Sequence, residues 1–242
     1  MTDLPTVAVV IYSYDRLTTA ELTLSALSEY LSYDGPLVLH LSDDGSPERP
    51  DGTPYIDALR MFAEGVWPDV DVQTSTSVRM GYGGSYNAAS QSTHAYADVL
   101  LPLEDDWELS RPFDITPLVH ALADPRVNCI RLGYLGYTQA LQGTVIDVNP
   151  MGKTLLFDEA SPERHIFAGH PRLETRAFQR AIGPWPERIQ AGQTEFDVSG
   201  RPESRVGVCW PLDLGIPGSQ RHDSLFRHIG ADGKGEIDPA AG

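Results

Sequence analysis

The sequence of 242 residues contains no run of about 18 apolar residues, the length that a helix needs to cross a bilayer. Its first ten residues, MTDLPTVAVV, also lack the basic stretch and the small-residue cleavage site of a secretory signal. The sequence therefore predicts a protein without a membrane span, and we expect it in the cytoplasm.

Cysteine is scarce. Cys129 and Cys209 are the two cysteines, and they lie far apart with no C-x-x-C or similar spacing. This pattern predicts neither a metal knuckle nor a disulfide framework, and it agrees with a reducing compartment.

Basic residues are few. The sequence has 18 Lys and Arg against 34 Asp and Glu, a formal net charge of −16. Such a charge opposes non-specific attraction to nucleic acid and to anionic membranes, so a nucleic-acid partner is disfavoured. An excess of carboxylates suits a protein that recruits a divalent cation to hold a phosphorylated substrate, but an ordinary solvated surface gives the same balance.

The residues that are present alternate between two hydrophobic periods. The hydrophobic content of 41% is ample for one sizeable core, and we expect a single α/β domain. Apolar runs predict strands, and apolar residues at helical spacing predict helices between them, which implies a mainly parallel sheet. The expected strands are 6–12, 37–42, 70–75 and 98–103, and the expected helices are 16–31, 53–64 and 85–96.

The pattern loosens in the later half of the sequence. We expect a strand in VNCIRLG, a hairpin formed by YTQALQGTVIDVN and TLLFD, and a short helix in LETRAFQRAI. These segments predict mixed strands beside the parallel sheet. The Gly/Asp/Ala-rich end of the sequence, 231–242, is predicted to be a flexible tail.

Polar clusters follow the expected strands at their carboxyl ends. Open α/β sheets bind ligands at that edge. Each cluster also has an ordinary explanation, since DDGS is a good turn, GYGG a flexible loop and three acids a solvated corner. The glycine segment lacks the full G-x-G-x-x-G pattern, so a dinucleotide site is disfavoured. The four clusters are Tyr12-Ser13-Tyr14-Asp15-Arg16, Asp43-Asp44-Gly45-Ser46, Arg79 with 81–87, and Glu104-Asp105-Asp106.

Together these clusters resemble the inverting family 2 glycosyltransferases of the GT-A fold. The resemblance rests on VAVVIYSYDR, on LHLSDDGSPE, and on GYGGSYNAASQSTHAYADVLLPLEDDW, in which LEDDW matches the acidic D-x-D signature. Asn87 matches a recurrent asparagine of the family, and Gly84 lies in the same segment. Farther on, FAGHPRLETRAFQRAIGPWPE is similar to the family's acceptor-side segment, and FRHIG resembles its late histidine.

The resemblance implies a Rossmann-like nucleotide-binding sheet with helices on both faces and a mixed acceptor-side half. It divides the chain into a nucleotide-sugar-binding half, 1–110, and an acceptor-binding half, 111–230. It further implies Mn²⁺ or Mg²⁺ held by Glu104, Asp106 and His228. The resemblance implies that Glu195 is the general base, and Asp197 is the second candidate for this role.

The donor site follows from the same resemblance and from the chemistry of a nucleotide-diphosphate sugar. Asp43 can accept the imide N–H of uracil or thymine, which favours a UDP or dTDP sugar over a guanosine one. Tyr12 or Tyr14 can stack on the base, and Arg79 can contact the diphosphate. The other expected donor-site residues are Ser13, Arg16, Asp44, Gly84, Asn87 and Asp105.

The sequence also departs from the family pattern. Glu104 occupies the first D-x-D position, Asp15 stands where asparagine is usual, and Thr194-Glu195 stands where the family has Glu-Asp. A catalytically silent nucleotide-sugar-binding or scaffold protein is therefore the alternative hypothesis. A nucleotidyltransferase with a similar sheet would be expected to carry a glycine-rich loop after its first strand. The segment IYSYDR at that place has no glycine, so this function is disfavoured. The Q-x-x-R-W signature of the processive polysaccharide synthases is absent, which favours transfer of a single sugar to a hydroxyl acceptor. Trp185 is either an acceptor-site residue or a core residue.

Overall fold

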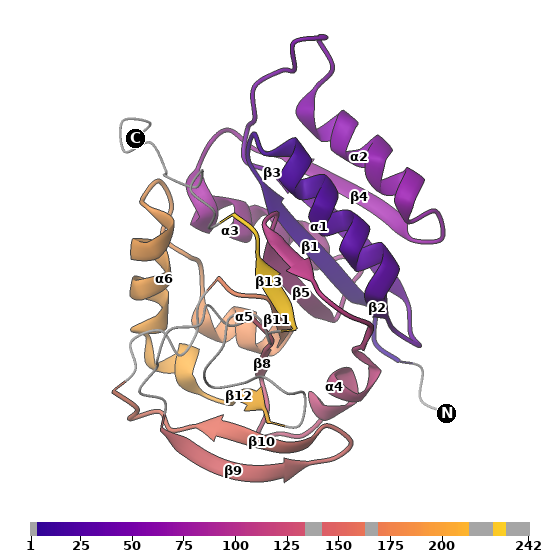
Figure 1. Ribbon diagram of the computed structural model, residues 1–242. Helices are drawn as coiled ribbons and strands as arrows, with labels where there is room; N and C mark the ends of the chain where they lie inside the picture. The colour runs from indigo at the N-terminus through magenta and orange to yellow at the C-terminus, as the bar shows by residue number, and fades with distance from the viewer. Residues whose placement is uncertain (1–3, 134–141, 163–168, 213–224, 231–242) are drawn as a thin grey trace.

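A computed structural model describes residues 4–133, 142–162, 169–212 and 225–230. They form one nine-stranded sheet in the order β4-β3-β1-β5-β11-β8-β12-β10-β9 (Figure 1). Its strands are β1 (Val7–Ser13), β3 (Leu37–Asp43), β4 (Asp71–Thr76), β5 (Val99–Glu104), β8 (Cys129–Arg131), β9 (Gly143–Val148), β10 (Gly152–Phe157), β11 (Arg172–Thr175) and β12 (Val208–Pro211).

Helices and two small sheets surround the large sheet. Strand β13 (Phe226–His228) pairs with β6 (Trp107–Leu109), and β2 (Leu31–Ser32) pairs with β7 (Phe113–Asp114). The helices are α1 (Leu17–Tyr30), α2 (Tyr55–Val66), α3 (Gly81–Thr93), α4 (Thr116–Ala121), α5 (Arg176–Ile182) and α6 (Ala191–Ser199), with a 3-10 turn at Pro202–Arg205.

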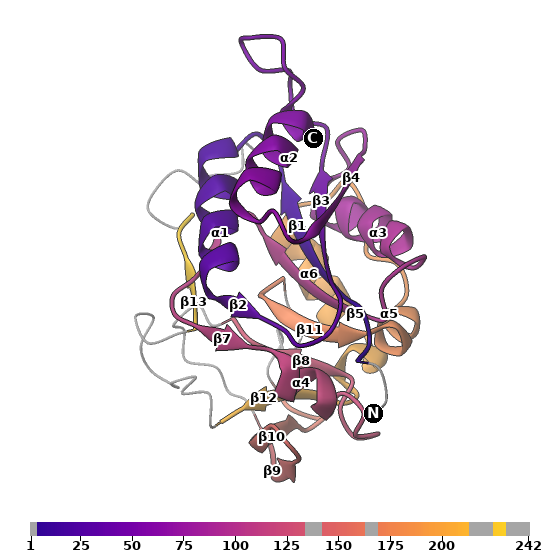
Figure 2. The same ribbon diagram turned by 90° about the vertical axis from the view of Figure 1, so that its right-hand side faces the viewer.

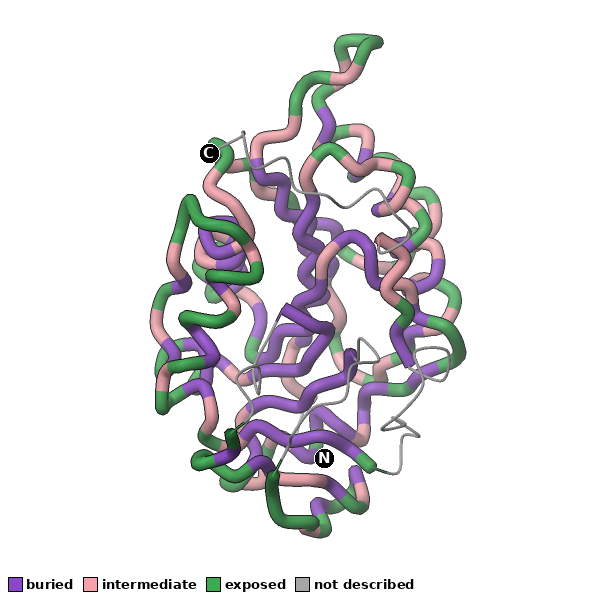
Figure 3. Tube along the Cα trace, turned by 60° about the vertical axis from the view of Figure 1, so that its left-hand side comes forward, coloured by how far each residue is buried: buried purple, intermediate pink, exposed green. Residues whose placement is uncertain are grey.

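Strand β1 lies at the centre of the parallel half, and its two faces belong to two cores. Val7, Val9 and Ile11 pack with α1 and α2, whereas Ala8 and Val10 pack with α3, α5 and α6. This alternation is the period of two that a strand buried on both faces imposes. Figure 2 shows α1 and α2 on one side of the strands and α3 on the other, and Figure 3 shows the buried strands running through the middle of the molecule.

Register brings the polar ends of the parallel strands to one edge. Ser13 is opposite Asp43 on β3, and Tyr12 is opposite Glu104 on β5. The order βαβαβ with parallel neighbours confirms the expected fold class. The carboxyl ends of β1, β3 and β5 therefore meet as the sequence predicts.

The second half continues the same sheet with mixed strands, as expected. Strand β11 lies antiparallel between β5 and β8, β12 runs parallel to β8, and β9 and β10 form the expected hairpin. The helix predicted over 173–182 begins only at Arg176, because the residues before it form β11.

The expectation of a flexible glycine loop at 81–84 is wrong, since Gly81 is the first residue of α3. The carboxylate of Asp44 accepts hydrogen bonds from the backbone N–H groups of Met80, at 2.7 Å, and Gly81, at 2.9 Å. A helix start leaves such N–H groups without partners, and an anion there stabilises it against the low helix propensity of glycine.

Two sequence expectations fall outside the described residues, namely the segment 231–242 and the first part of the hairpin segment. Cys129 and Cys209 are both buried free thiols, as the spacing predicted. Within the part of the chain that the structure describes, no helix is long and apolar enough to cross a membrane.

Candidate active site

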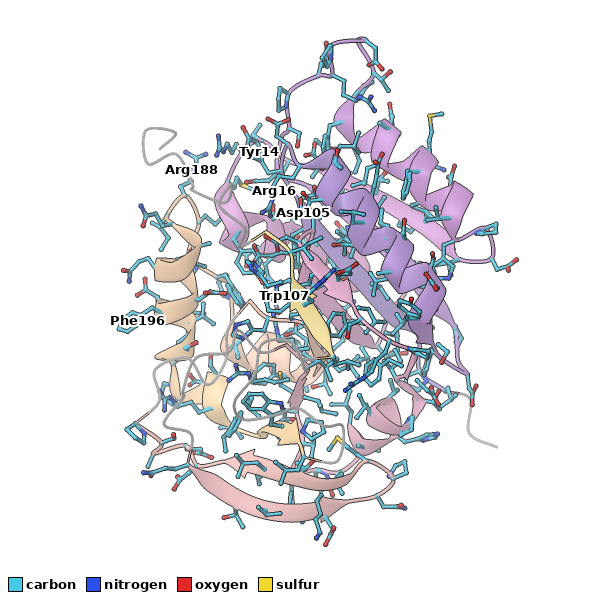
Figure 4. The ribbon with its side chains drawn as sticks, viewed as in Figure 1. Tyr14, Arg16, Asp105, Trp107, Arg188 and Phe196 are labelled. Atoms are coloured by element: carbon cyan, nitrogen blue, oxygen red, sulfur yellow. The ribbon has the colours of Figure 1, made fainter. Side chains whose placement is uncertain are left out.

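An acidic centre lies at the end of β5. Arg16, just after β1, forms ion pairs with both Asp105 and Asp106, the latter at 2.7 Å. Burial works against the charge of this guanidinium, but the two carboxylates outweigh it and raise the pKa of Arg16. Figure 4 places Tyr14, Arg16, Asp105 and Trp107 at this edge of the sheet.

Asp105 is fully buried and held from several sides. Its Oδ2 accepts a hydrogen bond from Ser13 Oγ at 2.6 Å, and its backbone oxygen accepts one from Thr23 Oγ1 at 2.7 Å. Ser13 in turn contacts the hydroxyl of Tyr55. Burial raises the pKa of Asp105 to about 7, although Arg16 and Ser13 lower it. In this position Asp105 anchors Arg16, and Ser13 is part of that anchor.

Asp106 faces the last described strand of the chain. Its Oδ2 lies 2.7 Å from Arg16 Nη1 and 3.3 Å from His228 Nε2, while its buried Oδ1 has no hydrogen-bond partner among the residues that the structure describes. Burial raises its pKa, but the hydrogen bond from His228 and the charge of Arg16 outweigh this effect, and the pKa of Asp106 is lowered. Strand β13 holds His228 there, because it pairs opposite Trp107 on β6.

Glu104 lies near carboxylates from both halves of the chain. Burial raises its pKa well above the ordinary value, and the negative charges of Asp106 and Glu195 raise it further. Glu195 comes from α6, and its Oε1 accepts a hydrogen bond of 2.5 Å from the backbone N–H of Gly169. The structure therefore brings the expected base to the expected acids.

Asp197 lies elsewhere on the same helix. Residues two apart on a helix point in widely different directions. The side chain of Asp197 is exposed and accepts a hydrogen bond of 2.7 Å from Gln193. Phe196, between the two acids, points away from the sheet edge (Figure 4). The helical geometry separates the reserve candidate from the acidic centre.

The two acids after β3 have different surroundings. Asp43 Oδ1 accepts hydrogen bonds from the backbone N–H of Ser46, at 3.0 Å, and from its hydroxyl, at 2.5 Å. Among the described residues, nothing donates to Asp43 Oδ2, so this oxygen can accept a ligand N–H. Both oxygens of Asp44 are occupied by the start of α3.

The two tyrosines after β1 also differ. Tyr12 is buried and packs edge-on against Tyr82, with 5.5 Å between ring centroids. Tyr14 is half-exposed, and the guanidinium of Arg79 lies 4.0 Å from its ring centroid while donating a hydrogen bond to its hydroxyl at 2.9 Å. Tyr14 and Arg79 are thus available to a ligand, whereas Tyr12 belongs to the core.

Asn87 has a clear structural contact. Its side-chain amide accepts from the backbone N–H of Trp185 at 2.8 Å and donates to the backbone oxygen of Trp185 at 3.0 Å. Trp185 is buried against Tyr82 and Tyr86, which supports its reading as a core residue. Gly84 is buried within α3, close to Met80. These residues hold the 185 segment against α3.

Sequence reasoning missed Tyr82 and Gly169. The hydroxyl of Tyr82 lies at the acidic centre, and burial raises its pKa so that it stays protonated. Gly169 approaches Glu195, Glu104 and Tyr82. Gly169 lies in FAGHP, within the acceptor-side segment of the resemblance, but no local sequence pattern indicates that it lies close to α6.

The donors at this edge suit a hard divalent cation. Within the described ranges, no group of three or more His, Cys, Asp or Glu side chains is arranged to hold a metal ion as it stands. Glu104, Asp106 and His228 nevertheless offer the oxygen and nitrogen ligands that Mn²⁺ accepts. The buried Asp106 Oδ1 accepts no hydrogen bond from the described part of the chain, and the carboxylates disfavour one another's charge. Both features fit a cation.

Solved structures share this architecture. No family model matches the sequence, and no curated protein matches it significantly. The mannosyltransferase PcManGT from Pyrobaculum calidifontis, in complex with GDP-Man and Mn²⁺, matches with a TM-score of 0.55 and 22% identity over 86% of this chain. S. aureus TarS 1–349 matches with a TM-score of 0.60 and 11% identity over 85% of this chain.

GalNAc-T7 with UDP, GalNAc and Mn²⁺ also matches, with a TM-score of 0.57 and 17% identity over 87% of this chain. The match spans 57% of the PcManGT chain, 57% of TarS 1–349 and 43% of GalNAc-T7. At these identities the likeness shows the fold, which is the GT-A fold.

Proposed function

We propose that this chain is a metal-dependent inverting glycosyltransferase of the family 2 type. It transfers one sugar from a nucleotide-diphosphate sugar to a hydroxyl acceptor on a glycan, a protein or a small molecule. The fold shared with PcManGT and TarS supports a nucleotide-sugar donor.

One observation carries this proposal. Glu104 ends strand β5 and Glu195 lies on helix α6, far away in the sequence, yet both carboxylates meet at Gly169. A transferase needs its base opposite its leaving group, which requires acids from two segments to converge. A silent scaffold has no need to hold like charges together at a cost in stability, so the alternative is not favoured.

Glu104, Asp106 and His228 would hold the Mn²⁺ or Mg²⁺. When bound, the cation neutralises the diphosphate and stabilises it as a leaving group. Arg16 contributes a second positive charge beside Asp106. Asp105 keeps Arg16 in place, because its own carboxylate is buried and fixed by Ser13.

Glu195 is proposed as the general base. It removes the proton from the acceptor hydroxyl while the hydroxyl oxygen attacks the anomeric carbon. The bond from that carbon to the diphosphate oxygen breaks, and its electron pair leaves with the diphosphate. Attack from the face opposite the diphosphate inverts the anomeric centre, so no enzyme nucleophile is needed.

The donor proposed is a UDP or dTDP sugar. Asp43 has one oxygen available for an imide N–H, since Ser46 uses only the other. The ring of Tyr14 can stack on the base, and Arg79, now resting on Tyr14, can turn to the diphosphate. Guanosine diphosphate sugars are the second choice.

The test is a donor panel with matched variants. The purified chain is incubated with UDP, dTDP, GDP, ADP and CDP sugars in Mn²⁺, and slow sugar release is measured without an acceptor. We expect hydrolysis of a UDP or dTDP sugar, and no binding or hydrolysis of any donor would favour the silent alternative. With an acceptor, Glu195→Gln should lower kcat by roughly 10²-fold or more at unchanged donor affinity.

Asp197→Asn is the matched control on the same helix. It should keep near-normal turnover, because Asp197 is exposed and lies away from Glu104. A normal Glu195→Gln protein beside an inactive Asp197→Asn protein would transfer the role to Asp197.

A further inference from the structure

Gly169 lies where three polar side chains come together. A Cβ atom at this position would overlap Oε1 of Glu195, and it would stand 3.1 Å from Oε1 of Glu104 and 3.2 Å from the hydroxyl of Tyr82. The absence of a side chain therefore lets the backbone approach the carboxylate of the proposed base. The reason for glycine here is space, because a real Cβ essentially never lies so close to another atom.

The backbone of Gly169 makes a specific contact in that space. Its N–H donates a hydrogen bond of 2.5 Å to Oε1 of Glu195. A backbone N–H on a carboxylate is a charge-assisted hydrogen bond, which is shorter and stronger than a neutral one. It fixes one oxygen of Glu195 and so sets the orientation of the whole carboxylate plane.

The residues directly after Gly169 are held in place by several contacts. The backbone N–H groups of Leu132 and Gly133 both donate to the oxygen of Pro171, at 2.8 Å and 3.0 Å. Nδ1 of His170 lies 3.1 Å from Nη2 of the buried Arg131. The ring of His170 packs edge-on against Trp107, 5.5 Å between centroids. These contacts tie the residues after Gly169 to β8 and to the acidic centre.

Helix α6, which carries Glu195, is held with similar tightness. Thr194 is fully buried, and its hydroxyl donates to the backbone oxygen of Pro186 at 3.4 Å. Gly83 of α3 lies against the same two residues. Both partners of the Gly169–Glu195 hydrogen bond thus stand on packed supports, which preorganises the carboxylate.

We propose that Gly169 is a positioning residue for the base: its N–H orients the Glu195 carboxylate, and its lack of a side chain makes room for it. This inference rests on the proposed function of Glu195. It goes beyond that function because it assigns a role to a backbone group on a different segment of the chain.

Gly169→Ala is the direct test. The new methyl group displaces the carboxylate, and a misplacement of about 1 Å can cost roughly 10²-fold in rate. We expect kcat to fall by about this factor. The methyl group overlaps Oε1 of Glu195 but stands 3.1 Å from Oε1 of Glu104, so the affinity for UDP in Mn²⁺, measured by calorimetry, should fall much less than kcat.

Gly192→Ala is the matched control. Gly192 lies on α6 as Glu195 does, and a Cβ there meets nothing within 4 Å. It should leave kcat and donor affinity unchanged. Normal kcat in Gly169→Ala would overturn the inference, provided that Glu195→Gln is inactive; if Glu195→Gln is also normal, the proposed base itself has failed.

Glu195→Asp provides a second test, in which Gly169 and the residues around it are unchanged. The side chain is one methylene shorter, so it withdraws from the N–H and makes room for a methyl group. In this background Gly169→Ala should cost little further activity, and equal costs in both backgrounds would contradict the orienting role. Amide hydrogen exchange at Gly169 should also be faster in Glu195→Asp, and unchanged exchange would overturn the hydrogen bond.

Discussion

Three consecutive acids at the end of β5 occupy three different environments. Glu104 faces Glu195 across the sheet edge, Asp105 is buried against Ser13, and Asp106 contacts His228. Glu104 ends β5, whereas Asp105 and Asp106 form the turn before β6, and in this turn Asp105 points inward to Ser13. A single guanidinium, that of Arg16, bridges the inner acid and the outer one. The three acids thus divide into two that are proposed to hold a metal ion and one that anchors Arg16.

The first prediction concerns the cation at this centre. Even with Glu104 neutral, the charges of Asp106 and Glu195 together outweigh that of Arg16, so a bare diphosphate is repelled at close range. Calorimetry should therefore show UDP binding in Mn²⁺ and a loss of at least about 10-fold in affinity in excess chelator.

Asp106→Asn should reproduce this loss in Mn²⁺. Asp71→Asn, on the edge strand β4, should not, because Asp71 is exposed and its side chain accepts a hydrogen bond from Gln73, away from β5. Equal affinities in chelator and in Mn²⁺ would show that the metal assignment is wrong.

The second prediction concerns His40, a buried residue of β3. Its ring nitrogens lie 2.7 Å from the Tyr96 hydroxyl and 2.9 Å from Ser75 Oγ. Burial lowers its pKa to about 4. Above the ordinary value of about 6.5 the imidazole is neutral in both states. As the pH falls below that value, His40 binds a proton in the unfolded chain, whereas in the folded protein it stays neutral until about pH 4.

The folded state therefore loses stability across this window, by up to about 3 kcal/mol. His40→Gln does not titrate there. Between pH 7 and pH 4 the free energy of unfolding, measured by urea denaturation, should therefore fall more for the wild type than for His40→Gln. Other groups cancel in this difference, and parallel pH curves would contradict the prediction.

At the scale of elements, the position of α6 depends on how closely α3 meets the segment after Trp185. A Cβ on Gly83 would overlap the backbone oxygen of Pro186, and it would stand 3.1 Å from Thr194 Cγ2. Asn87 binds the backbone of Trp185 from the same helix. Glycine weakens a helix interior by about 1 kcal/mol relative to alanine, so its presence in α3 reflects packing.

The third prediction tests this packing. Gly83→Ala should lower the free energy of unfolding by about 1–3 kcal/mol, because the backbone on the far side has to move. It should also lower kcat, since α6 carries Glu195. Gly65→Ala, in α2, is the control: a Cβ there meets nothing within 4 Å, and stability should change by no more than about 1 kcal/mol. Equal effects of the two variants would show that the close approach is unimportant.

At the scale of the whole molecule, the two halves share one sheet and the cores on both of its faces. Strand β11 of the second half pairs with β5 of the first, with Glu174 opposite Leu100 and Thr175 opposite Val99. Leu173 belongs to the same core cluster as Val9. Because the site lies where these halves meet, its geometry depends on both being folded together.

The fourth prediction is that the halves unfold in one transition. Trp67 lies in the first half, and Trp185 and Trp210 lie in the second, so tryptophan fluorescence reports on both. Urea curves from fluorescence and from far-UV circular dichroism should coincide, with equal midpoints and slopes. Two separated midpoints would show that 1–110 and 111–230 are independent units.

The sequence by itself determined the parallel half of the fold and the strand-end acids. Local periodicity and β-branched runs predict β1, β3, β4 and β5, because burial on both faces of a strand leaves a continuous apolar pattern. The order of these elements then places Asp43 and Glu104 at one edge, since parallel strands share their carboxyl ends. The sequence left open whether 191–199 is extended or helical, because its apolar pattern is weak.

The tertiary structure decided which of these residues face one another. The turn after β5 directed Asp105 inward, the helical geometry of α6 separated Glu195 from Asp197, and the carboxylate of Asp44 converted a predicted loop into the start of α3. The contact between Gly169 and Glu195 has no sequence signal at all. It joins two segments of the second half through a backbone N–H and the space left by a missing side chain, and both depend on how helix α6 packs beside Gly169.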